Sequence, residues 1–316
     1  MTTTSDLFGG ARGALPATPG SYGLAPSGAR LPDATRLGPV RLQVADLDRS
    51  LAFYGSTLGM RLLHRDGGDA ALAPHGDERP LVELRSRSGA APAGSPARLG
   101  LYHFALLLPD RAALGALVRH LGDVGARFGA ADHLVSEAFY LNNPDGLGIE
   151  VYTDRPRSAW RRVDREVMMG TDPVDIEGVL AAAEERPWTG LAAATTVGHV
   201  HLHVGDLPHA NTFYGDGLGF DRMVWSYPGA SFLGAGGYHH HLGANTWAGP
   251  GARPAGAEDA RLLEWTIELP SEAHVAAVAA NLTDHGFTPR RDGDDVLIDD
   301  PWGTTVRVKL ESPPAP

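Results

Sequence analysis

Residues 131–150 read Ala-Asp-His-Leu-Val-Ser-Glu-Ala-Phe-Tyr-Leu-Asn-Asn-Pro-Asp-Gly-Leu-Gly-Ile-Glu. The Asn-Pro-Asp-Gly segment at 143–146 predicts a tight turn, and the apolar and aromatic residues on either side of it predict two paired strands. Such a hairpin brings Tyr140 close to Glu150. Because a carboxylate within an apolar strand needs a partner, Glu150 is a candidate metal ligand. The alternative is a hairpin whose Glu150 faces water.

Length and composition indicate a globular chain. The 316 residues, of which 21% are charged, predict about two domains. No apolar run approaches the roughly 18 residues of a membrane span and no signal peptide is visible, so we expect a cytoplasmic protein without a membrane partner. The net charge of -11 argues against nucleic acid as a partner. Because the chain has no cysteine, a metal would need His, Asp or Glu ligands.

The chain contains an internal repeat. Residues 37–60 and 197–220 are identical at 11 of 24 positions, and a weaker pair relates 101–109 to 262–270. Each copy predicts a strand, a helix and three further strands. We therefore expect an α+β fold of four βαβββ units. The predicted segments are a mobile tail over 1–36, a first half over 37–154 with units 37–95 and 99–154, a connecting segment over 155–195, and a second half over 196–312 with units 197–250 and 261–310.

This arrangement resembles the vicinal oxygen chelate superfamily, whose βαβββ units pair into half-barrels around a metal. The 131–150 stretch resembles the signature of its type I extradiol dioxygenases through His133, the apolar-Tyr pair ending at Tyr140, the Pro-x-Gly turn and Glu150. The likeness is greatest to catechol 2,3-dioxygenases of the CatE type. It extends through the motifs at 101–104, 152–156, 198–202 and 236–247.

The resemblance implies a metal site of two His and one carboxylate, which leaves coordination positions open for a catechol and O2. Members of the family use Fe(II) or, in some cases, Mn(II). Ligands lie on the first and fourth strands of a unit, which points to His103 and Glu150 in unit two. Unit one has Pro39 where a second His would stand, whereas unit three has His199. The expected ligands are therefore His103, His199 and Glu150.

Other histidines have more than one interpretation. His201 follows His199 on the same strand face, and it is the alternative ligand as well as a candidate pocket residue. For His203 we favour a polar, solvated strand face. Among His239, His240 and His241, the resemblance assigns one as the acid/base, and alignment favours His240. His133 and Tyr140 resemble the pair that hydrogen-bonds to substrate oxygen. The candidate substrate-binding residues are His201, His241, Tyr238 and Asn245.

Unit four departs from the pattern, because Glu264 and Arg307 stand where unit two has His103 and Glu150. We therefore predict that units two and three pair around the metal while units one and four form a metal-free half. In that half, Glu83 and Glu264 could attract an adventitious cation.

Three functions fit these observations. An Fe(II)-dependent extradiol dioxygenase acting on a small aromatic diol and O2 is favoured. A metal-dependent isomerase or lyase of the glyoxalase type is the alternative, and it commonly adds a second carboxylate to the metal. A binding or drug-sequestering protein is disfavoured by the ligand set. The sequence leaves homo-oligomerisation open.

Overall fold

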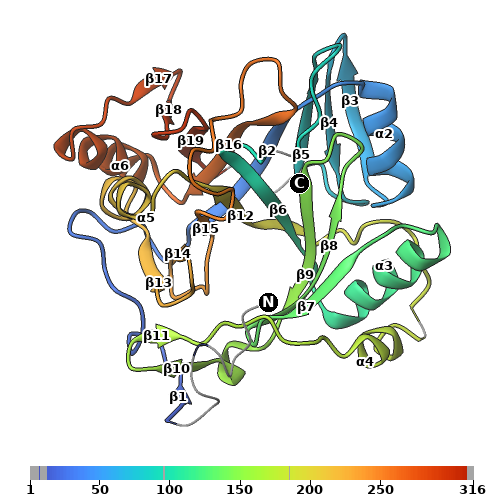
Figure 1. Ribbon diagram of the computed structural model, residues 1–316, viewed down its shortest axis with the longest axis horizontal. Coiled ribbons are helices and arrows are strands. Elements are labelled where there is room, and N and C mark those ends of the chain that lie inside the picture. The colour runs from blue at the N-terminus through green and yellow to red at the C-terminus, as the bar shows by residue number, and fades with distance from the viewer. Residues whose placement is uncertain (1–6, 8–12, 95–96, 185, 312–316) are drawn as a thin grey trace.

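The computed structural model describes residues 7, 13–94, 97–184 and 186–311. In this part of the chain, the strands form two eight-stranded sheets and one small three-stranded sheet. Figure 1 shows the two large sheets together, with helices on their outer faces. Their central strands pack against each other, β12 (Thr196–His203) on β2 (Arg36–Val44) and β16 (Arg261–Leu269) on β6 (Gly100–Leu107).

The first large sheet joins units two and three. Strand β6 pairs antiparallel with β12 at its centre, and the outer strands of each unit follow on either side. Its strands in spatial order are β13 (Asp221–Val224), β14 (Ala230–Gly234), β15 (Leu242–Asn245), β12 (Thr196–His203), β6 (Gly100–Leu107), β9 (Gly148–Asp154), β8 (Ser136–Asn142) and β7 (Gly129–Asp132).

The second large sheet joins units one and four in the same way, with β16 antiparallel to β2 at its centre. Its strands in spatial order are β17 (Arg290–Asp292), β18 (Asp295–Asp299), β19 (Thr305–Leu310), β16 (Arg261–Leu269), β2 (Arg36–Val44), β5 (Val82–Ser86), β4 (Asp69–Ala73) and β3 (Arg61–Asp66). The predicted α+β fold and the pairing of units two with three and one with four are confirmed.

The helices form where the repeat predicts them. Asp46, Asp110 and Ser271 accept hydrogen bonds from the first turns of their helices, as N-cap residues do. The second helix buries an apolar stripe that includes Leu114 and Leu121. The helical segments are α2 (Leu47–Ser56), α3 (Arg111–Asp123), α4 (Ile176–Ala181), α5 (Leu207–Ala210), the π-helix η2 (Asn211–Gly217), α6 (Glu272–Asp284) and the 3-10 turn η1 (Arg157–Ala159).

The tail prediction for 1–36 is wrong over residues 13–36. Strand β1 (Leu15–Pro16) pairs with β10 (Arg161–Val163), which pairs with β11 (Glu166–Val167). Leu31 is 2% exposed, and the Leu24 amide donates to the Arg222 carbonyl. The segment lacks hydrophobic periodicity because isolated apolar residues, and not a regular pattern of them, pack it against other elements. Residues 1–6 and 8–12 lie outside the described part.

No helix among the described residues is long and apolar enough to cross a membrane.

Candidate active site

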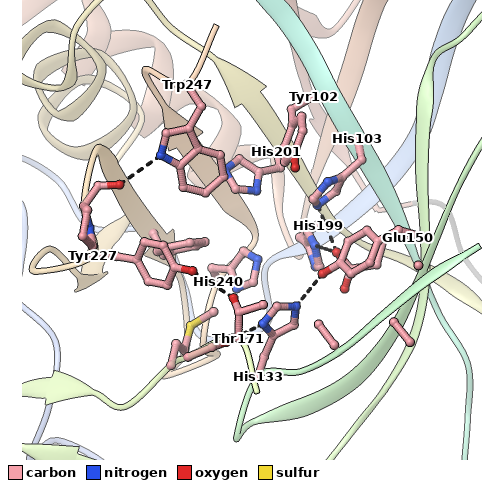
Figure 2. A pocket seen from close by; sticks show the side chains of 18 residues that line it. Tyr102, His103, His133, Glu150, Thr171, His199, His201, Tyr227, His240 and Trp247 are labelled. Carbon is pink, nitrogen blue, oxygen red and sulfur yellow. Dashed lines mark hydrogen bonds and ion pairs between the residues drawn. The ribbon is translucent and has the colours of Figure 1, made fainter. Parts of the chain in front are cut away.

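Three strands of the first sheet carry the predicted metal ligands. Ala105 of β6 is the Cα partner of Glu150 in β9 on one side and pairs with His199 in β12 on the other. His103 lies two residues before Ala105, and side chains two apart on a strand share a face. The three side chains therefore converge over a small, fully buried alanine. Figure 2 shows them pointing toward one another.

The distances fit a ligand set. Glu150 Oε2 lies 3.0 Å from His103 Nε2 and 3.1 Å from His199 Nε2. One ligand atom from each residue lies within 4.8 Å of the others, and all three residues are buried. Among the described residues, His103 Nε2 is a buried nitrogen that makes no hydrogen bond of good geometry. The set offers two imidazoles and one carboxylate, and one imidazole nitrogen makes no hydrogen bond. Such a set suits a divalent metal.

Electrostatics prepare the same groups for coordination. Burial opposes ionisation of Glu150, but the imidazoles of His199 and His103 outweigh burial and hold the pKa of that carboxyl well below its usual range. Burial lowers the pKa of His103, against the opposing effect of Glu150. At neutral pH the set therefore presents an ionised carboxylate and a neutral His103 imidazole, the forms that bind metals.

Tyr140 and His133 form a second pair next to the ligands. In the hairpin, Tyr140 is the Cα partner of Glu150, as the turn predicted. His133 Nδ1 lies 2.6 Å from the Gly170 carbonyl, which only accepts, so this nitrogen carries the proton in the neutral ring. His133 Nε2 then accepts a hydrogen bond from the Tyr140 hydroxyl. Burial and the charge of Glu150 raise the pKa of Tyr140 well above its usual value.

A cavity of about 450 Å³ opens over the ligand set. One wall holds His103, His199 and Glu150 with Tyr140 and His133. The opposite wall is largely apolar and aromatic, as the residues labelled in Figure 2 illustrate. It includes Tyr227, Phe232, Trp247 and Met169. A cavity with a few convergent polar groups facing apolar side chains is typical of a small-molecule site.

His201 and His240 also line this cavity. His240 stacks close to His199, with ring centroids 4.1 Å apart, and lies 5.0 Å from the ring of Phe232. Burial, and then the neighbouring imidazoles, lower the pKa values of His201 and His240 well below their usual range. Both rings are therefore neutral at physiological pH.

Three residues predicted to contact substrate do not reach this cavity. Tyr238 and His241 line a different cavity of about 340 Å³. Asn245 is fully buried and accepts a hydrogen bond from His203 at 2.7 Å. This contact also corrects the expectation for His203, which is half-buried rather than solvated. The His239–241 triplet lies in the loop between β14 and β15 and not on a strand.

Several residues of this cavity were not predicted from the sequence. Met169, Gly170 and Thr171 come from the segment read as a mere connection between the halves. Thr171 Oγ1 lies 2.9 Å from the hydroxyl of Tyr227, which closes the apolar wall. The Met-Met-Gly-Thr stretch that follows β11 was a weak sign of a packed segment, because Met and Gly are residue types that are often buried.

The corresponding site of the second sheet holds ion pairs. Arg307 Nε lies 2.7 Å from Glu264, and a second nitrogen of Arg307 lies 2.7 Å from Asp295. Glu83 lies 3.3 Å from Arg41. Glu264 and Glu83 each pair with an arginine, but Arg307 is shared with Asp292 and Asp295, so the expectation that these carboxylates could attract a cation stays a prediction.

Comparisons with known proteins agree with this geometry. The model of the Glyoxalase/Bleomycin resistance protein/Dioxygenase superfamily matches residues 36–151. Catechol-2,3-dioxygenase of Bacillus subtilis (strain 168) is 42% identical over 271 residues, which cover 84% of this chain and 94% of that protein. The chain belongs to the extradiol dioxygenases of this superfamily. It is therefore an oxidoreductase of the catechol 2,3-dioxygenase type, and the family and enzyme class predicted from the sequence are confirmed.

Solved structures show the same fold. A Bacillus subtilis protein described as a dioxygenase candidate matches with a TM-score of 0.63 at 10% identity, covering 91% of this chain and 87% of that one. Glyoxalase I from Zea mays matches with a TM-score of 0.51 at 17% identity, covering 87% of this chain and 92% of that one. At such identities the likeness shows the fold alone.

Proposed function

We propose that this extradiol dioxygenase is Fe(II)-dependent and opens the ring of a catechol with O2. The observation that carries the proposal is the convergence, in one cavity, of a two-His, one-carboxylate set with a Tyr-His pair and a further neutral histidine. The first group fits a metal that keeps open positions, and the others fit the proton movements that ring cleavage requires.

In this proposal, His103, His199 and Glu150 hold the metal. Bound there, Fe(II) would supply a binding place for both catechol oxygens and for O2, and the electrons that activate O2. Mn(II) is the metal that could replace it. The ligand set includes no second carboxylate within the described residues, which favours a dioxygenase over the glyoxalase-type alternative.

The remaining side chains act on the substrate directly. His240, neutral and on the cavity wall, accepts the proton of a catechol hydroxyl and returns it later. The raised pKa of Tyr140 keeps its hydroxyl protonated, and turning this hydroxyl from His133 Nε2 toward the substrate would let it donate to negative charge that develops on substrate oxygen. His133, held by the Gly170 carbonyl, orients that hydroxyl. Phe232 and Trp247 supply apolar surface for the ring.

The test is direct. Protein loaded anaerobically with Fe(II) is mixed with catechol and then with oxygenated buffer, while absorbance and O2 consumption are followed. We expect a yellow ring-cleavage product and the uptake of one O2 for each catechol consumed. Activity should fall on exposure to air and return with Fe(II) and a reductant. Full activity after prolonged chelation would contradict the iron requirement.

Two further outcomes would overturn the rest of the proposal. Conversion of a glyoxalase substrate without O2 uptake would favour the isomerase or lyase. O2 uptake by the Mn(II)-loaded protein, with none by the Fe(II) form, would change the metal. A screen of substituted catechols then identifies the substrate, because substituents are recognised by the shape of the apolar wall.

A further inference from the structure

Behind His240, a chain of side chains leads out of the cavity. His240 Nδ1 lies 2.7 Å from Nδ1 of the adjacent His239, and His239 Nε2 lies 2.9 Å from Asp154 Oδ1. Asp154 ends strand β9, on the same face as Glu150 four residues earlier. Strand β9 therefore carries both the candidate metal ligand Glu150 and Asp154, the last member of this hydrogen-bonded row of side chains.

The partners fix the direction of the hydrogen bonds. The Asp154 carboxylate only accepts, so His239 Nε2 must carry a proton and donate it. In a neutral His239 ring, Nδ1 is then the acceptor. His240 Nδ1 must therefore donate to it, and His240 Nε2 is left without a proton.

The ring of His239 is enclosed by aromatic side chains and held by Asp154. Its side chain is fully buried, and its ring packs 4.1 Å from Tyr238 and 5.3 Å from Trp160. Asp154 also accepts from the Tyr238 hydroxyl at 3.3 Å, so its charge is shared between two donors.

We propose that Asp154 and His239 are positioning residues that hold His240 in its Nδ1-protonated form, so that its bare Nε2 is the nitrogen offered to the substrate hydroxyl. This inference rests on the proposed acid/base role of His240. It explains why a run of three histidines is useful: the first orients the second, and the third lies on another cavity. Neither Asp154 nor His239 lines the substrate cavity.

The test measures the tautomer of His240 itself. The protein, labelled with ¹⁵N in its histidines and loaded with diamagnetic Zn(II), is examined by long-range ¹H-¹⁵N correlation, with His240→Gln used for assignment. We expect Nδ1 of His240 to be protonated and Nε2 unprotonated. In Asp154→Leu, whose side chain is apolar and has no acceptor, both nitrogens of His240 should show averaged shifts. Asp154→Glu keeps the carboxylate and should restore the wild-type pattern at least in part.

A matched control separates the effect of the Asp154–His239–His240 hydrogen bonds from a general effect of altered packing. Tyr238→Phe removes the other hydrogen bond to Asp154 but leaves His239 untouched, so the His240 tautomer should not change. If Asp154→Leu does not fold, His239→Phe replaces it, because a ring without nitrogen also removes the acceptor of His240. In the Fe(II) form, kcat of Asp154→Leu should fall more than about tenfold, toward the 10²–10⁴-fold expected for loss of an acid/base group. KM should change little.

The possible results are distinct. A His240 with its proton on Nε2 in the wild type, or one that does not respond to Asp154→Leu or His239→Phe, would overturn the inference even if the enzyme cleaves catechol. The expected tautomers in a protein that does not cleave catechols would leave the hydrogen-bond chain standing and refute the proposed function.

Discussion

Glu150 and Arg307 occupy corresponding positions in the two large sheets. Glu150 on β9 is the Cα partner of Ala105 in the parallel strand β6, and Arg307 on β19 is the Cα partner of Thr266 in the parallel strand β16. One position faces two imidazoles and the other binds Glu264. The same repeat thus builds a candidate metal site in one sheet and an ion pair in the other.

His240→Ala should keep the metal and slow turnover. The side chain lines the cavity but is not among the three ligand candidates, so metal content should stay at the wild-type level. Loss of a general acid/base costs about 10²–10⁴-fold in kcat. Steady-state kinetics with metal analysis check both, and His64→Ala on the exposed strand β3 is the control. An unimpaired His240→Ala would move the acid/base role to another residue, His133 being the next on the cavity wall.

Gly148→Ala should loosen the ligand set. A Cβ at 148 would overlap the Tyr102 carbonyl oxygen and approach the Cβ of His103 to 3.0 Å, at the point where β9 pairs with β6. Overpacking of this kind costs about 1–3 kcal/mol in the free energy of unfolding, and it separates His103 from Glu150. Chemical denaturation and metal titration measure the two effects.

Gly122→Ala is the matched control for that variant. Gly122 lies in α3, and no atom lies within 4 Å of an added Cβ. Replacing a helical glycine with alanine stabilises by about 0.5–1 kcal/mol. If the two alanine variants proved equally stable and equally metal-loaded, close contact between β6 and β9 at Gly148 would not matter.

His241 should make the protein less stable in acid. Burial, reinforced by the neighbouring imidazoles of His239 and His199 and by Arg157, lowers the pKa of His241 from 6.5 to about 3 in the folded state. Between these values the unfolded chain binds a proton that the folded chain does not. Stability therefore rises with pH from about 3 to 6.5, by at most about 1.4 kcal/mol per pH unit from this residue.

His241→Asn tests that dependence. The Asn oxygen can accept from the Ala235 amide, as His241 Nδ1 does at 3.1 Å, but it does not titrate. Denaturation between pH 4 and pH 7 should give a shallower slope for the variant than for the wild type. Identical slopes would show that His241 gains its proton in the folded protein as readily as in the unfolded chain.

Local patterns in the sequence predicted the hairpin that carries Glu150 and the pairing of the four units. The turn at 143–146 placed Tyr140 opposite Glu150, and the contrast of His199 with Pro39 and Arg307 predicted which units share the metal candidate. The features that the sequence could not predict depend on packing between segments far apart in the chain. The Met169–Thr171 wall and the anchoring of Leu31 involve segments without periodicity, whose positions are set by the elements they cover. The loop conformation that joins His239 to His240 was missed for the same reason.

Metal content of a matched pair of variants tests the central claim, that units two and three build the metal site. Glu150→Gln and Glu264→Gln each replace one carboxylate, and the two carboxylates lie in the corresponding regions of the two related sheets. Each variant and the wild type are loaded anaerobically with Fe(II), desalted and analysed for bound iron. We predict that the wild type and Glu264→Gln keep equal amounts of iron and that Glu150→Gln loses it. Iron retained by Glu150→Gln and lost from Glu264→Gln would place the metal in the other sheet and contradict the account.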